Sequence, residues 1–166
     1  MKLFEEHQIR PIDIEMVNKE PIDVVMKYTD YTDKTLNRKG INEIIKEKDM
    51  DELKYSIRSI LKYIPWVRKI FIVMPNDKVR FLKPIEEIKD KFEYIKEKDL
   101  IGFDTINSAA LQFRLFELKK HGISVNFIYM NDNYFIGEHL KKTDFFYYDE
   151  QSKKIVPAIV NNYFCE

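Results

Sequence analysis

The sequence predicts an α/β protein with a mostly parallel sheet flanked by helices, because segments of β-forming residues alternate with segments of helical periodicity. The clearest strand is the continuous apolar run 70–74, as expected of a strand buried on both faces. The clearest helix precedes it and ends at Pro65. The chain has 166 residues, which is enough for one domain with a sizeable core.

The other expected elements follow in chain order. Residues 1–20 are expected to form a loosely attached arm or an edge strand, and residues 21–166 a single α/β domain. Residues 22–26 are rich in β-forming side chains and lead into a polar segment, which predicts the first strand and a loop. Further strands are expected at 92–95 and 125–130, and then at 144–148 and 155–160 as a short antiparallel C-terminal addition.

Two segments carry helical signals. In the first, 49–64, apolar residues recur at helical spacing and carboxylates occupy the first turn, where they suit the helix dipole. The second, 107–121, has a basic last turn followed by Gly122, at the position where a left-handed C-cap belongs. Each of these helices precedes a predicted strand, which supports the α/β assignment.

Composition and charge argue against several classes of protein. The 28 Lys and Arg residues balance 28 Asp and Glu residues, so a dedicated nucleic-acid binder is not expected. No apolar run approaches the roughly 20 residues needed to span a bilayer, and Glu5, Glu6 and Asp13 lie where a signal peptide would be apolar. The single cysteine, Cys165, excludes an internal disulfide. A cytoplasmic protein is expected, with at most peripheral contact with a membrane.

Polar side chains follow each predicted strand of the parallel sheet at the point where the strand ends. In an open parallel sheet these ends meet at one edge, outside which ligands bind. We therefore expect the residues to share a crevice that handles a metal ion or sugar hydroxyls, although Asp and Asn also favour turns for backbone reasons. They are Asp30 and Asp33 after the first strand, Asn76 and Asp77 after the second, Glu97 and Asp99 after the third, and Asn131, Asp132 and Asn133 after the fourth.

The sharpest of these groups is 131–133 (Asn-Asp-Asn), because the apolar segment before it would hold Asp132 rigidly at the sheet edge. A carboxylate flanked by amides suits a hard cation, or a base that accepts a proton from a sugar hydroxyl. An Asx turn explains the same residues equally well.

Two further groups could bind phosphate. Asn107 and Ser108 open the second helix, where free backbone N–H groups favour anions, but ordinary N-capping is the more common role of such residues. Arg58 lies on the first helix with Lys54 and Lys62 four residues away on either side. That pattern is more typical of a solvated helix face than of a phosphate clamp.

Several strings of the chain closely resemble the Stealth family. This family comprises sugar-phosphotransferases, including bacterial capsule-polymer phosphotransferases and the lysosomal-enzyme GlcNAc-1-phosphotransferase. The resemblance covers the first and second conserved blocks only, over most of the chain. The matching strings are 22–33 in the first block, and 51–60 (DELKYSIRSI), 65–73 (PWVRKIFIV), 105–110 and 127–132 in the second.

The resemblance implies transfer of a sugar 1-phosphate from a nucleotide-diphosphate sugar to a hydroxyl of an acceptor glycan, in the synthesis of a capsule or another cell-surface polysaccharide. It implies a Rossmann-like fold of the nucleotide-sugar transferase type and a divalent cation, Mg²⁺ or Mn²⁺. By position, Asp132 and Asp30 would be catalytic residues, and Asp132 and Asn133 would hold the metal. The residues matched to substrate or nucleotide binding are Asp33, Arg58, Asn107, Ser108 and Asn131.

The chain departs from the family pattern at several places. Asn133 replaces an Asp and Tyr31 replaces a Gly, while Gln112 and Glu97 stand where Glu and His are usual. The family's later blocks, which supply His and Arg residues, do not follow within the 166 residues. We therefore expect the N-terminal part of a longer catalytic unit, or a chain that acts with a partner chain. Two alternatives stay open: a glycosyltransferase that uses a nucleotide sugar, and a non-catalytic remnant that binds a nucleotide sugar or a partner chain.

Overall fold

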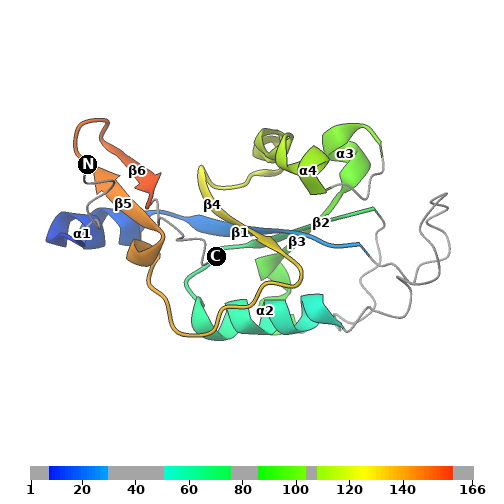
Figure 1. Ribbon diagram of the computed structural model, residues 1–166, viewed down its shortest axis with the longest axis horizontal. Helices are drawn as coiled ribbons and strands as arrows, with labels where there is room; N and C mark the ends of the chain where they lie inside the picture. Colours follow the sequence, from blue (N-terminus) through cyan, green and yellow to red (C-terminus); the bar gives the residue numbers. More distant parts are fainter. Residues whose placement is uncertain (1–7, 30–50, 76–85, 104–107, 159–166) are drawn as a thin grey trace, which may run out of the picture.

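The fold is a parallel sheet with helices on both faces, joined to a small antiparallel sheet (Figure 1). The computed structural model describes residues 8–29, 51–75, 86–103 and 108–158. The parallel strands are β1 (Ile22–Lys27), β2 (Ile70–Met74), β3 (Phe92–Lys96) and β4 (Asn126–Asn131), in the order β3-β2-β1-β4. The antiparallel strands are β5 (Phe146–Asp149) and β6 (Lys154–Pro157), and short 3-10 helices, η2 (Glu86–Lys91) and η4 (Lys142–Asp144), precede β3 and β5. The predicted α/β architecture with an antiparallel addition is confirmed.

Helix α2 (Glu52–Tyr63) covers one face of the parallel sheet and lies below it in Figure 1. The apolar residues of α2 fall on one stripe, so they are buried together against the sheet. In this stripe Leu53 and Ile60 pack with Val24 and Ile72 of the strands. Each such fully buried side chain contributes about 1.5–3 kcal/mol, which fixes the helix firmly to this face. At 12 residues α2 is the longest helix in the described ranges, and none of those helices is long and apolar enough to cross a membrane.

The opposite face is covered by shorter helical segments, which lie above the sheet in Figure 1. The single helix predicted for 107–121 is wrong, because hydrogen bonds from Arg114 N to Leu111 O and from Glu117 N to Arg114 O span three residues and tighten the turn. Leu111 and Leu118 are both fully buried against the sheet, and the two phenylalanines between them are exposed. Gly122 follows with φ 76°, in the left-handed conformation that was predicted. The segments are α3 (Glu97–Ile101), α4 (Ser108–Gln112) and the 3-10 helix η3 (Leu115–His121).

The N-terminal segment contains a helix, α1 (Pro11–Lys19), and not the edge strand or loose arm that the sequence suggested. Proline at the first helical position and Asp13 in the first turn both favour the start of a helix. Val17 is fully buried and packs against β1 and β5. The Asp13 carboxylate accepts hydrogen bonds from the Arg10 side chain and from the backbone N–H of Tyr148, the latter at 2.9 Å. Helix α1 is therefore tied to the antiparallel sheet.

The amino ends of three strands are joined by Asp23 of β1, whose side chain is fully buried. Its carboxylate accepts two hydrogen bonds from the Arg68 guanidinium, at 2.9 and 2.6 Å. It also accepts the backbone N–H of Lys69 at 3.0 Å and that of Ser124 at 2.6 Å. Arg68 and Lys69 lead directly into β2, and Ser124 lies just before β4. Asp23 therefore fixes these strands where they begin, at the edge opposite to their carboxyl ends.

Candidate functional site

The carboxyl ends of the parallel strands lie at one edge of the sheet, as predicted. β1 and β4 are neighbours, with Lys27 paired to Asn131. β1 and β4 therefore end at the same edge, and Asp132 directly follows β4 there. Asp30 and Asp33 themselves lie outside the described residues, so their place in the site stays a prediction.

Asp132 lies in a β-turn that directly follows β4. The backbone N–H of Tyr134 donates to the carbonyl oxygen of Asn131 at 3.1 Å, which places Asp132 and Asn133 at the two central positions of the turn. Asp132 is partly buried and Asn133 is exposed. The structure brings these predicted residues together, and the turn itself is one physical reason for their residue types. The turn places the Asp132 carboxylate directly at the end of β4.

The pKa of the Tyr129 hydroxyl, on β4, is shifted by its surroundings, which include the charge of Asp132. Burial raises the pKa of Tyr129 above its usual value, the polar side chain of Gln112 lowers it in part, and the Asp132 carboxylate raises it. Tyr129 therefore stays protonated at neutral pH and can act only as a neutral hydroxyl beside the turn.

The raised pKa of Tyr129 predicts a loss of stability at alkaline pH. The unfolded tyrosine ionises near pH 10, whereas the folded tyrosine holds its proton to a higher pH. Its contribution to the free energy of unfolding is therefore fully present below about pH 10 and is lost as the pH rises toward the folded pKa. Urea unfolding of the wild type and of Tyr129→Phe between about pH 8 and 11 measures this. We expect the wild type to lose more stability than the variant above about pH 10, and parallel curves would contradict the prediction.

Lys27 and Glu97 form a buried ion pair at the same edge, with 3.1 Å between Nζ and Oε1. Glu97 begins α3 and is fully buried, and Lys27 ends β1 with 7% of its side chain exposed. Glu97 was predicted among the edge acids, whereas Lys27 was not, although a lysine at the end of an apolar run was the available signal. Pairing reduces the cost of burying each charge, and the pair links β1 to the start of α3.

Arg58 lies on the solvent side of α2, away from the buried stripe of that helix. Arg58 is exposed on α2, and its Cζ atom lies 5.7 Å from the ring centroid of Tyr55. This cation–π contact is typical of a solvated helix face. Ser108 begins α4, which has only 5 residues, and Asn107 lies outside the described residues. The contacts of all three with a substrate stay predictions.

Within the described ranges, no three His, Cys, Asp or Glu side chains gather closely enough to hold a metal ion. Asp132 supplies a carboxylate and Asn133 an amide oxygen, which are donors of the kind that Mg²⁺ and Mn²⁺ prefer. Two such donors do not fill an octahedral site. The divalent cation therefore stays a prediction for Asp132 and Asn133.

Comparison with known proteins identifies the family. Residues 46–154 match the family model described as Stealth protein CR2, conserved region 2. A capsular polysaccharide phosphotransferase of Actinobacillus suis is 32% identical over 155 residues, which is 87% of this chain and 40% of the relative. One of Neisseria meningitidis serogroup B is 32% identical over 144 residues, 76% of this chain and 38% of the relative. An exopolysaccharide phosphotransferase of Streptomyces coelicolor is 31% identical over 139 residues, 76% of this chain and 23% of the relative.

The chain thus spans less than half the length of these curated relatives. The match nevertheless includes the whole of α2, the parallel strands β2, β3 and β4, and the turn that carries Asp132. It also covers most of the described residues. The chain therefore belongs to the Stealth family.

Proposed function

We propose that this chain forms the acidic edge of a sugar-phosphate transferase that acts in the synthesis of a capsule or another cell-surface polysaccharide. The observation that carries the proposal is the match to relatives named capsular or exopolysaccharide phosphotransferases, at 31–32% identity over at least 76% of the chain. The position of Asp132 at the carboxyl edge of a parallel sheet supports it, because ligands of such sheets bind there. A cytoplasmic location is part of the proposal, and the single cysteine is compatible with a reducing compartment.

The proposed reaction moves a sugar 1-phosphate from a nucleotide-diphosphate sugar to a hydroxyl of an acceptor glycan. The hydroxyl oxygen attacks the phosphorus that bears the sugar, and a new P–O bond forms. The P–O bond to the bridging oxygen of the diphosphate breaks, and the nucleoside monophosphate leaves. Asp132 would take the proton of the attacking hydroxyl, as a carboxylate fixed on a rigid strand end can.

The remaining residues of the proposal bind and orient the reactants. Protein groups mainly position phosphoryl-transfer reactants and neutralise charge. Asp30 would act beside Asp132, and Mg²⁺ or Mn²⁺ held in part by Asp132 and Asn133 would neutralise phosphate charge when bound. The groups assigned to the donor or acceptor are Asp33, Arg58, Asn107, Ser108 and Asn131.

A product assay tests the proposal. The chain is incubated with UDP-N-acetylglucosamine, and then with other nucleotide sugars, in the presence of Mg²⁺ or Mn²⁺ and candidate glycan acceptors, with EDTA as the control for the cation. We expect release of the nucleoside monophosphate, UMP for this donor, together with phosphodiester formation on the acceptor.

The other outcomes separate the alternatives. Release of UDP would identify a glycosyltransferase, because the sugar–phosphate bond would then have broken. Donor binding without turnover would identify a non-catalytic remnant. Neither turnover nor binding across the set of donors would contradict both enzymatic readings.

A further inference from the structure

We propose that Ser56 and Ser59 of α2 are positioning residues that hold the turn carrying Asp132 in place. In its functional part this inference rests on the proposed function, because it assumes that Asp132 reacts. It concerns the strap, which we define as residues 134–140, the irregular segment that follows the turn and runs beside α2. Arg58, between the two serines, faces solvent, whereas Ser56 is fully buried.

The two serines contact the main chain of the strap. Ser56 Oγ donates to the carbonyl oxygen of Tyr134 at 2.5 Å. Ser59 Oγ accepts the backbone N–H of Ile136 at 3.0 Å and donates to the carbonyl oxygen of Ser56 at 2.7 Å. The Ser59 hydroxyl is thus engaged both as donor and as acceptor, which fixes its orientation and links the two serines to each other.

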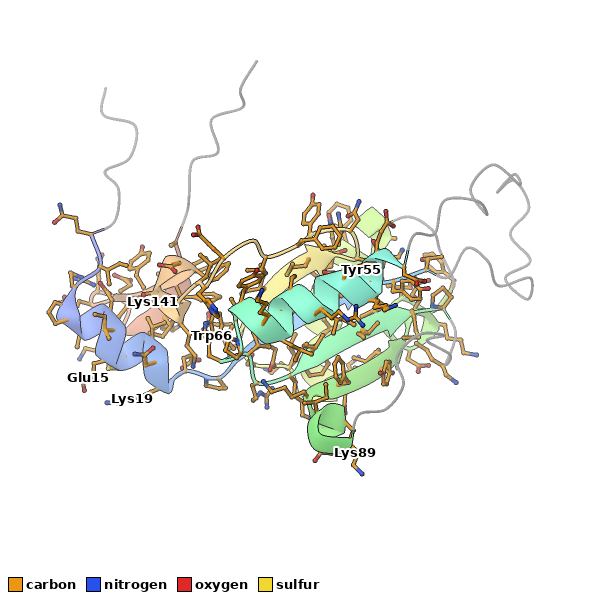
Figure 2. All side chains as sticks on the ribbon, turned by 90° about the horizontal axis from the view of Figure 1, so that it is seen from below. Glu15, Lys19, Tyr55, Trp66, Lys89 and Lys141 are labelled. Carbon is orange, nitrogen blue, oxygen red and sulfur yellow. The ribbon has the colours of Figure 1, made fainter. Side chains whose placement is uncertain are left out.

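Two more contacts hold the far end of the strap. The backbone N–H of Leu140 donates to the carbonyl oxygen of Tyr63 at 3.2 Å, and Trp66 Nε1 donates to the carbonyl oxygen of Leu140 at 2.7 Å. Ser56, Ser59 and Tyr63 are three or four residues apart on α2, a spacing that places neighbours on one side of a helix, and Trp66 follows beyond the helix end. Figure 2 shows α2 extending between Tyr55, near one of its ends, and Trp66, beyond the other.

Tyr134 belongs to both the strap and the turn, so contacts of the strap at Tyr134 restrain the turn. Its N–H closes the turn on Asn131, and its carbonyl oxygen is held by Ser56. Asn131 is itself fixed by pairing with β1. Both ends of the turn, Asn131 and Tyr134, are therefore fixed by hydrogen bonds, and only Asp132 and Asn133 lie between them. A catalytic group held in this way keeps its reacting distance, and a displacement of about 1 Å can cost roughly 100-fold in rate.

The experiment compares the near and far ends of the strap. Ser59→Ala removes the hydroxyl that orders Ile136, and Ser59→Thr restores it, because a helical threonine can still bond the carbonyl three or four residues earlier. Trp66→Phe is the matched control, since it also deletes one side-chain hydrogen bond to the strap backbone, but at Leu140.

In the transfer assay we expect Ser59→Ala to lower kcat about 10- to 100-fold, with KM changed by no more than about twofold. Ser59→Thr and Trp66→Phe are expected to keep kcat near that of the wild type, even where Trp66→Phe lowers the melting temperature. Equal losses of kcat in Ser59→Ala and Trp66→Phe would overturn the proposal and make the strap a general stabilising element.

Amide hydrogen exchange tests, without any measurement of activity, whether the two serines hold the turn. The Tyr134 N–H is the decisive probe, because its acceptor on Asn131 is untouched by either substitution. We expect its exchange to be at least about tenfold faster in Ser59→Ala and unchanged in Trp66→Phe. Unchanged exchange of Tyr134 in Ser59→Ala would overturn the inference whatever the assay shows. One outcome is no transfer by the wild type together with faster exchange of the Tyr134 N–H in Ser59→Ala. In that case the proposed function is contradicted, but the structural role of the two serines is supported.

Discussion

Asp132→Asn is expected to lower the rate of sugar-phosphate transfer by about 10²- to 10⁴-fold, the range in which loss of a general base falls. Asparagine has nearly the same shape and suits the same turn position, so the hydrogen bond between Tyr134 and Asn131 should persist. The free energy of unfolding should stay within about 0.5 kcal/mol of the wild type, as for most substitutions outside the core. Transfer rates and urea unfolding of the same preparation measure the two effects.

An exposed carboxylate outside the turn provides the control for this substitution. Glu138 lies on the strap, so Glu138→Gln removes one negative charge without touching the turn. Its transfer rate should match that of the wild type. A large loss of stability in Asp132→Asn would recast Asp132 as a structural turn residue, and an unchanged rate would remove it from the role of base.

Asp23→Asn is expected to destabilise the chain by about 1–3 kcal/mol, the cost of leaving a buried hydrogen-bond donor without its acceptor. The carboxylate of Asp23 accepts hydrogen bonds from Arg68, Lys69 and Ser124, and an amide can accept with only one of its two terminal atoms. At least one buried donor would therefore lose its partner. Urea unfolding monitored by circular dichroism measures the loss.

Asp99→Asn is the control for Asp23→Asn, because Asp99 is an exposed acid on α3. It should change the free energy of unfolding by no more than about 0.5 kcal/mol. If Asp23→Asn lowered the free energy of unfolding as little as Asp99→Asn, the hydrogen bonds of Asp23 at the amino ends of the strands would not contribute to stability. Arg68→Met offers a second check, since it removes the guanidinium but leaves the two backbone donors in place.

The parallel strands could be predicted because their residues carry the signal locally. The apolar run 70–74 is β2 without change, and β1 and β3 extend one residue beyond the expected segments. The segment 107–121 could not be predicted correctly, because its helical spacing does not reveal the tighter hydrogen bonds near Arg114. Helix α1 was missed for a similar reason: its stability comes from Asp13 and Val17, which contact strands more than a hundred residues later.

The site could be predicted only in part. The position of Asp132 at the sheet edge followed from the topology of a parallel sheet, and its turn from the preference of Asp and Asn for turns. The contacts of Ser56 and Ser59 with the strap join residues 77 or 78 positions apart, and a serine inside a helix gives no local sign of such a role. Lys27 was missed because its partner, Glu97, lies at the start of α3, far from it in the sequence.

The four hydrogen bonds between α2, Trp66 and the strap all engage main-chain atoms of the strap. The side chains at 135 and at 137–139 can therefore be exchanged without loosening those bonds. Proline is ruled out at 136 and 140, where it would remove a donating N–H. Substitutions at 135 and at 137–139 can therefore change the surface that follows the turn while the backbone contacts that hold the turn are kept.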